Sequence, residues 1–175
     1  MASDLDEQRF GMREAALYSG FYPKLLRTQL ERGTYTCGVR HPPPVSRWTF
    51  SIADVLFLRL LNDLTGVPPG FEPSRMVNAA RALTQDARDV WGGREPDDLK
   101  VALGWESTVD LMEHVKVRGN FSAAWINGSD RWPRMQIVVP VGRAVADVRE
   151  AMNEKPHVVT MPPNPFGSAR SGREE

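Results

Sequence analysis

The sequence predicts an α+β fold in which two short helices, a hairpin and a third helix precede a connecting helix and a small α+β domain. Apolar residues recur at helical spacing in several segments, β-prone runs flank a proline-rich loop, and glycines and prolines separate the segments. With 41% apolar and 25% charged residues in 175 positions, the composition is typical of a globular protein with a packed core. We expect a first unit over residues 9–66, a connecting helix over 71–93, a mixed domain over 99–153 and a disordered tail over 154–175.

The first two predicted helices are short and separated by a tight turn. Residues Met12 to Tyr18 favour a helix that ends near Gly20. Pro23 is tolerated at the first position of the second helix, which Gly33 ends. Leu26 and Leu30 share one face of that helix. Its opposite face is polar and carries Lys24, Arg27, Thr28 and Glu31.

A hairpin and a third helix are predicted next. The runs Thr34 to Cys37 and Arg47 to Phe50 are β-prone, and the loop of residues 40–44 between them contains three prolines. Ser51 is a suitable N-cap for an apolar helix from Ile52 to Leu64, and Asp54 stands where a capping-box acid is expected. This helix is apolar on more than one face, so we expect it to be packed on several sides.

The connecting helix is predicted to run from Pro73 to Trp91, before Gly92 and Gly93. Its apolar residues recur at a spacing that resembles a short coiled-coil seam: Met76, Ala80, Leu83, Ala87 and Val90. Two interpretations remain open. The seam forms a contact between two copies of the chain, or it packs against the chain's own core.

The patterns in the mixed domain are weaker. Candidate strands cover Leu99 to Trp105, Ala123 to Asn127 and Met135 to Val141, and a helix is expected from about Gly142 to Met152. Residues 107–118 are interpreted as a further helix. The segment after Lys155 is rich in proline and small polar residues, which favours disorder.

A net charge of zero hides an uneven distribution, because residues 9–61 hold eight basic and three acidic side chains. This excess coincides with the second helix and the hairpin, a pattern typical of phosphate-binding proteins, although scattered surface charge is the alternative. A helix with one buried and one cationic face fits the major groove of DNA. The candidate DNA-binding residues are Tyr22, Lys24, Arg27, Thr28, Arg32, Arg40, His41 and Arg47.

Residues 12 to about 83 resemble the MerR-type winged helix-turn-helix family and its relatives among excisionases and phage DNA-packaging subunits. The resemblance rests on the short alanine-containing helix of residues 13–20, on Leu26 to Gly33, and on Arg47 to Leu56. Two features depart from the family pattern: Thr28 and Gln29 replace a pair of tyrosines, and the wing is longer and proline-rich. The resemblance implies that Arg27 and Arg47 contact the DNA backbone.

The resemblance also implies a homodimeric transcriptional regulator that binds double-stranded DNA. One alternative is an antitoxin-type protein that binds a protein partner through residues 99–152 and its own operator through the N-terminal unit. Another is an architectural or packaging protein that binds DNA without regard to sequence.

Other classes of function find little support in the sequence. No Walker loop, dinucleotide fingerprint or nucleophile elbow occurs, so we expect neither an enzyme nor a cofactor. We also expect no metal site, because Cys37 and His41 supply two ligands at most. The acidic N-terminus and the lack of an apolar run of about 20 residues favour a cytoplasmic protein with no membrane contact.

Overall fold

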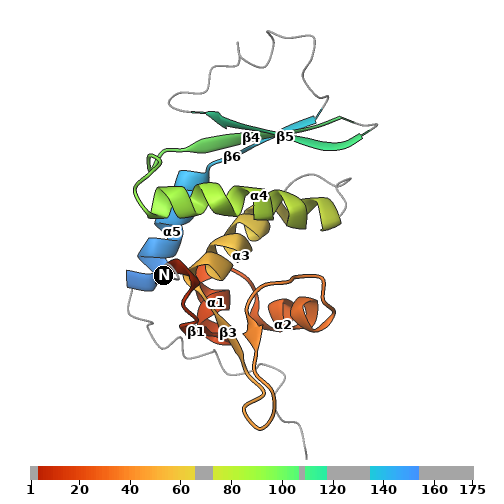
Figure 1. Cartoon of the computed structure of the whole chain (residues 1–175), viewed down its shortest axis with the longest axis vertical. Coiled ribbons are helices and arrows are strands. Elements are labelled where there is room, and N and C mark those ends of the chain that lie inside the picture. The colour runs from red at the N-terminus through yellow and green to blue at the C-terminus, as the bar shows by residue number, and fades with distance from the viewer. Residues whose placement is uncertain (1–3, 66–72, 107–108, 118–134, 154–175) are drawn as a thin grey trace, which may run out of the picture.

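The computed structural model describes residues 4–65, 73–106, 109–117 and 135–153. The described elements are, in chain order, η1 (Asp4–Asp6), β1 (Phe10–Gly11), α1 (Met12–Ser19), α2 (Pro23–Glu31), β2 (Val39–Arg40), β3 (Trp48–Phe50), α3 (Ile52–Thr65), α4 (Pro73–Trp91), β4 (Lys100–Glu106), β5 (Val109–Val117), β6 (Met135–Val139) and α5 (Val141–Asn153). They combine helices with small antiparallel sheets, as the α+β prediction requires. In Figure 1, α1, α2 and the first sheet lie at one end of the molecule, and the second sheet lies at the other.

The helices α1 and α2 confirm the first two predicted helices. Gly20 ends α1 with a left-handed φ of 77°, a conformation that glycine adopts without strain. Pro23 stands in the first turn of α2, as predicted. Leu26 and Leu30 are buried against the core, so the opposite face of α2 is directed to solvent.

The first sheet has the strand order β1-β3-β2. Phe10 pairs with Phe50, and Arg40 pairs with Trp48. The prediction of a strand over Thr34 to Cys37 is wrong, because the amides of Thr34 and Tyr35 donate to the carbonyl of Gln29 at the end of α2. Gly38 then turns the chain with a φ of 71°, and β2 begins only at Val39.

The start of α3 is capped as predicted. The amide of Asp54 donates to Ser51 Oγ at 3.1 Å, and the amide of Ser51 donates to the Asp54 carboxylate at 2.9 Å. These two bonds form the reciprocal capping box. Most side chains of α3 are buried, because the helix packs against α1, α4 and α5.

The apolar seam of α4 is used inside the chain. All five seam residues are buried, and α4 packs them against α3 and α5. The interpretation of this seam as a contact between two copies is therefore wrong. The alternative, packing against the chain's own core, is confirmed.

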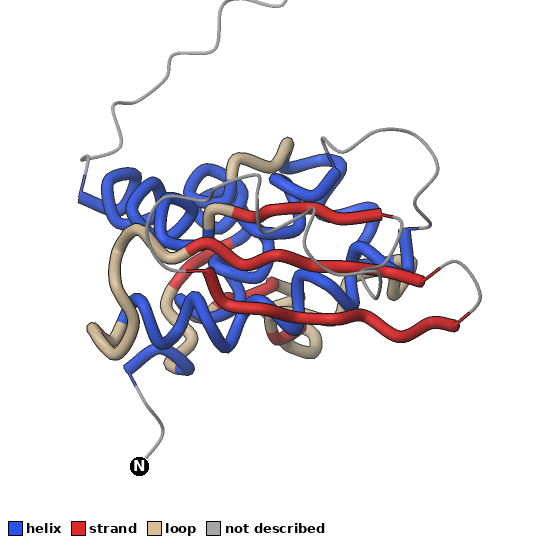
Figure 2. Tube along the Cα trace, turned by 90° about the horizontal axis from the view of Figure 1, so that it is seen from above, coloured by secondary structure: helices blue, strands red, loops and turns tan. Residues whose placement is uncertain are grey.

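The second sheet has the order β5-β4-β6 and is antiparallel throughout (Figure 2). The predicted helix over 107–118 is wrong, because residues 109–117 form β5, which pairs with β4 from Lys100↔Val117 to Glu106↔Val109. The predicted strands at Leu99 to Trp105 and Met135 to Val141 are confirmed as β4 and β6, with shifted ends. The predicted strand Ala123 to Asn127 and the predicted tail 154–175 lie outside the described residues.

The helix α5 joins the C-terminal part of the chain to the N-terminal helices. It packs against α1, α3 and α4, and the Arg59 guanidinium on α3 donates to Asp147 on α5 at 2.6 Å. The buried side chains of the described segments form one core that includes residues from all three predicted units. Within these segments, every helix falls short of the combined length and hydropathy of a bilayer span.

The close approach of α5 to the loop before β4 predicts the effect of one substitution. The amide of Gly142 donates to Leu99 O at 2.9 Å, and a Cβ at position 142 would overlap the carbonyl oxygen of Asp97. We expect Gly142→Ala to lower the free energy of unfolding by roughly 1–3 kcal/mol, the usual cost of overpacking. Urea denaturation measures this change in the free energy of unfolding. Ala146→Ser, on the exposed side of α5, is the control and should change stability by less than about 0.5 kcal/mol. Equal stability of the two variants would contradict the close packing.

Candidate nucleic-acid interface

The exposed face of α2 carries the helical part of the candidate site. Lys24 and Arg27 are exposed, whereas Leu26 and Leu30 are buried. Thr28 is half-buried and donates its hydroxyl to Lys24 O at 3.0 Å, so its hydrogen is engaged within the helix. Tyr22 directly precedes the helix with 67% of its surface exposed, and Arg32 is exposed at its C-terminal end.

A groove of about 300 Å³ separates α2 from the hairpin formed by β2 and β3. Its lining residues come from α2, from the hairpin and from the junction of β1 and α1: Gly11, Met12, Arg27, Glu31, Arg40, Ser46, Arg47 and Trp48. Three of the predicted site residues, Arg27, Arg40 and Arg47, thus line one cavity. Residues distant in sequence meet here because the hairpin folds back beside α2.

The charged side chains that line the groove form no ion pairs among the described residues. No hydrogen bond or ion pair joins the side chains of Arg27, Arg40 or Arg47 to any other residue that the structure describes, and the same holds for Glu31, the carboxylate in the groove. Five other arginines among the described residues are paired with carboxylates: Arg9 with Asp4 and Glu7, Arg59 with Asp63 and Asp147, Arg88 with Asp6, Arg94 with Asp89, and Arg149 with Asp97. Arg13, Arg32, Arg81 and Arg143 are not paired with a carboxylate of a described residue. Unpaired cations that line one cavity create a positive potential that attracts a polyanion.

The remaining predicted residues take different positions. His41 Nε2 shares a hydrogen bond with Thr49 Oγ1 at 2.9 Å, so the imidazole is half-buried within the hairpin and does not line the groove. The groove is not lined by Lys24 on α2, nor by Tyr22 and Arg32 at the two ends of that helix.

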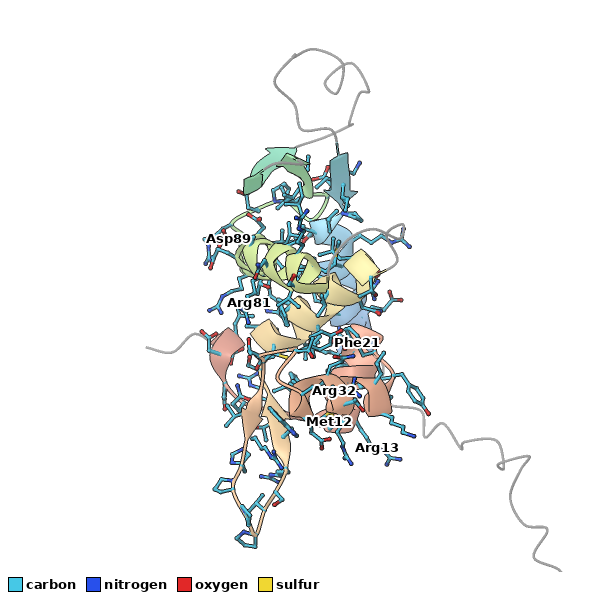
Figure 3. All side chains as sticks on the ribbon, turned by 90° about the vertical axis from the view of Figure 1, so that its right-hand side faces the viewer. Met12, Arg13, Phe21, Arg32, Arg81 and Asp89 are labelled. Carbon is cyan, nitrogen blue, oxygen red and sulfur yellow. The ribbon has the colours of Figure 1, made fainter. Side chains whose placement is uncertain are left out.

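Several contributors were missed from the sequence. Gly11, Met12, Ser46 and Trp48 line the groove. Arg13, on α1, is exposed at the same end of the molecule as Met12 and Arg32 (Figure 3). The charge of Arg13 within the cationic segment 9–61 was a signal that could have found it. Gly11 and Met12 gave no such signal, because only the pairing of β1 with β3 brings them to the hairpin.

The base of the hairpin is held by buried or bonded groups. The rings of Trp48 and Phe50 stack at a centroid distance of 6.4 Å, and Phe50 is fully buried. The amide of Gly38, directly before β2, donates to Asp54 Oδ1 at 3.0 Å. The hairpin therefore starts from a fixed point on α3, and its arginines are held beside α2.

The one cysteine of the described residues is buried, and these residues hold no cluster of metal ligands. Cys37 is buried, and burial, followed by the charge of Asp54, raises the pKa of its thiol to about 12. A thiol that stays protonated is a poor nucleophile and a poor metal ligand. Within the described segments, no three histidine, cysteine or acidic side chains lie together as metal ligands would.

Comparisons with known proteins add no family to this picture. No protein-family model matches the chain, and no curated protein matches it as a relative. The roles assigned to the groove therefore rest on its own geometry and charge.

The Asp54 carboxylate is the group whose removal should loosen the hairpin. It accepts from the amides of Ser51 and Gly38 and from Gln8 Nε2. We expect Asp54→Asn to lower the free energy of unfolding by roughly 1–3 kcal/mol, because an amide cannot accept at both positions and one donor is left unpaired. It should also speed hydrogen exchange at the Gly38 amide.

Urea denaturation and hydrogen exchange followed by NMR measure these two effects. The control is Asp98→Asn, at an exposed carboxylate between α4 and β4 with no ion pair to a described residue. Unchanged exchange at Gly38 in Asp54→Asn would show that the carboxylate does not hold the hairpin.

Proposed function

We propose that this chain is a DNA-binding transcriptional regulator of the winged helix-turn-helix type. In this proposal α2 is the recognition helix and enters the major groove, while the hairpin is a wing that lies on the adjacent phosphate backbone. The observation that carries the proposal is the groove in which Arg27 of α2 meets Arg40 and Arg47 of the hairpin, with no ion pair to a described carboxylate. Glu31 lines the same groove, so the three arginines leave an excess of positive charge there.

The dimensions of α2 support this docking mode. An α-helix with its side chains is about 10–12 Å in diameter, and the major groove, about 12 Å wide, admits it. Leu26 and Leu30 fix the helix to the core, so its exposed side chains face the duplex without loss of packing. Arg27 suits a phosphate or the edge of a guanine, and Glu31 suits the amino group of a cytosine.

The hairpin arginines are suited to affinity more than to sequence selection. Arg40 lies on β2, and Arg47 directly precedes β3. From these positions both side chains would reach phosphates beside the major groove of the DNA. Phosphate contacts release counterions, so affinity would fall steeply as salt rises. Sequence choice would then come from α2.

Substitution of the groove arginines tests the proposal. A duplex selected by the protein from a random library is compared with a scrambled duplex by fluorescence anisotropy. We expect Arg27→Ala to weaken binding to the selected duplex by roughly 1–3 kcal/mol and to reduce the preference over the scrambled one. Arg47→Ala should weaken binding to both duplexes and reduce the salt slope by about 1.

Two controls make the result specific. Arg143→Ala removes an exposed arginine of α5, which begins beside the second sheet, and should leave binding unchanged. Thermal unfolding of Arg27→Ala and Arg47→Ala should match the parent, because both side chains are exposed and unpaired among the described residues. Selection of no preferred sequence would favour an architectural protein. Equal weakening by Arg143→Ala would contradict the proposed surface.

A further inference from the structure

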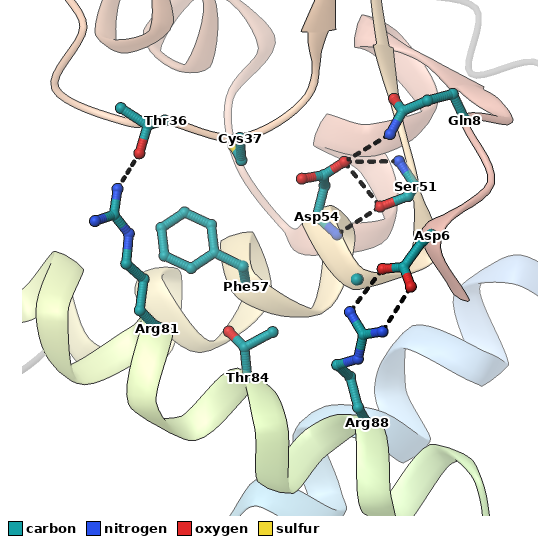
Figure 4. A pocket seen from close by; sticks show the side chains of 11 residues that line it. Asp6, Gln8, Thr36, Cys37, Ser51, Asp54, Phe57, Arg81, Thr84 and Arg88 are labelled. Carbon is teal, nitrogen blue, oxygen red and sulfur yellow. Dashed lines mark hydrogen bonds and ion pairs between the residues drawn. The ribbon is translucent and has the colours of Figure 1, made fainter. Parts of the chain in front are cut away.

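A second cavity, of about 440 Å³, lies on the side of α3 that faces α4 (Figure 4). It is bounded by η1, by the segment that leads into β2, by the first turns of α3 and by α4. It shares no lining residue with the cationic groove. Its volume lies within the range of roughly 300–1,000 Å³ that small-molecule sites occupy.

The middle of this cavity is apolar. The Phe57 ring and the Cys37 side chain face the same space in Figure 4, although only 5% and 8% of the two residues is exposed. Ala53 adds a third apolar wall. Because burial raises the pKa of Cys37 to about 12, its thiol is neutral and behaves as an apolar group. A ligand with a short hydrocarbon body can cover these three side chains.

The two carboxylates at one end of the cavity are hydrogen-bonded within the chain. Arg88 donates two hydrogen bonds to the Asp6 carboxylate, both at 2.7 Å. The Asp54 carboxylate accepts from Ser51 and Gly38 amides and from Gln8. Asp6 is thus balanced by Arg88, whereas the donors to Asp54 are neutral and satisfy its hydrogen bonds without balancing its charge.

The opposite end carries a cation without a carboxylate. The guanidinium of Arg81, on α4, donates to Thr36 Oγ1, and no carboxylate of a described residue pairs with it. The Thr36 hydroxyl accepts this bond, so its own hydrogen remains available to a ligand. Arg81 and Thr36 thus offer donors to an anionic group on the side of the cavity opposite Asp6 and Arg88 (Figure 4).

We propose that this cavity binds a small organic acid, whose carboxylate is held by Arg81 and Thr36 and whose apolar body covers Phe57 and Cys37. The guanidinium and hydroxyl supply charge-assisted hydrogen bonds, and the apolar walls supply burial. At its end of the cavity Arg81 repels an amine of equal size, which distinguishes the amine from the acid. The binding site is independent of the proposed contact with DNA.

Occupancy of this cavity would be felt at the start of the hairpin. Thr36 and Cys37 directly precede Gly38, whose amide bonds to Asp54 and whose φ of 71° turns the chain into β2. A Cβ at Gly38 would lie 2.7 Å from the Phe50 ring, so this turn has little room to move without its neighbours. A ligand held by Thr36 should therefore shift the Gly38 amide signal.

An NMR titration of the isotope-labelled full chain, without DNA, tests the proposal. The probes are benzoate, phenylacetate and hexanoate, with benzylamine as the cation of matched size. We expect saturable shifts of the amides of Thr36, Gly38 and Thr84 with at least one acid, and no saturable shift with benzylamine. Arg81→Met keeps the apolar stem and should weaken that binding roughly tenfold or more, as loss of a charged hydrogen bond does.

Arg143→Met on α5 is the matched control and should bind the acid as the parent does. The proposal is overturned if none of the three acids gives saturable shifts at these amides, if benzylamine binds equally well, or if Arg81→Met binds as the parent does with an otherwise unchanged spectrum. Because no DNA is present, these outcomes are separate from success or failure of the proposed regulator.

Discussion

The carboxylate of Asp54 joins three segments on which the cationic end of the molecule depends. It caps α3 through Ser51, accepts the amide of Gly38 at 3.0 Å before the hairpin, and accepts the side chain of Gln8 before β1. Asp54, on α3, therefore fixes the position at which the hairpin starts. Because α2 is fixed to the same core by Leu26 and Leu30, the helix and the hairpin keep a defined separation.

The groove differs from the rest of the described surface in how many arginines without a carboxylate partner lie together. Arg59 on α3, Arg88 on α4 and Arg149 on α5 are tied to carboxylates, whereas Arg81 on α4 and Arg143 on α5 stand singly without one among the described residues. In the groove between α2 and the hairpin, Arg27, Arg40 and Arg47 have no such partner among the described residues. Clustered unpaired cations repel one another, and a phosphate backbone relieves that repulsion. This contrast favours a nucleic acid over a neutral partner at the groove.

Local features of the fold could be predicted from the sequence, and non-local ones could not. The polar face of α2 and the cap of α3 depend on residues within one or two helical turns, and both are confirmed. The strand β5 was mistaken for a helix, although Val109, Leu111, Val115 and Val117 fall on the same side of an alternating pattern, a spacing that favours a strand, and pairing with β4 determines the outcome. The apolar seam of α4 was correctly located, but periodicity does not say which surface covers it.

The candidate site shows the same division. Arg27, Arg40 and Arg47 could be chosen from charge and helical phase, whereas Gly11 and Met12 reach the groove only through the pairing of β1 with β3. The cavity beside Arg81 could not be predicted either, since its walls come from η1, the segment before β2, α3 and α4.

The most direct measurement of the central claim is a map of the DNA contact by NMR, with a selected duplex added to the isotope-labelled chain. The account predicts amide shifts concentrated at Gly11 and Met12, along α2 and in the hairpin, with little change in β4 and β6. Shifts centred on the second sheet or on α5, or none at any duplex concentration, would contradict it.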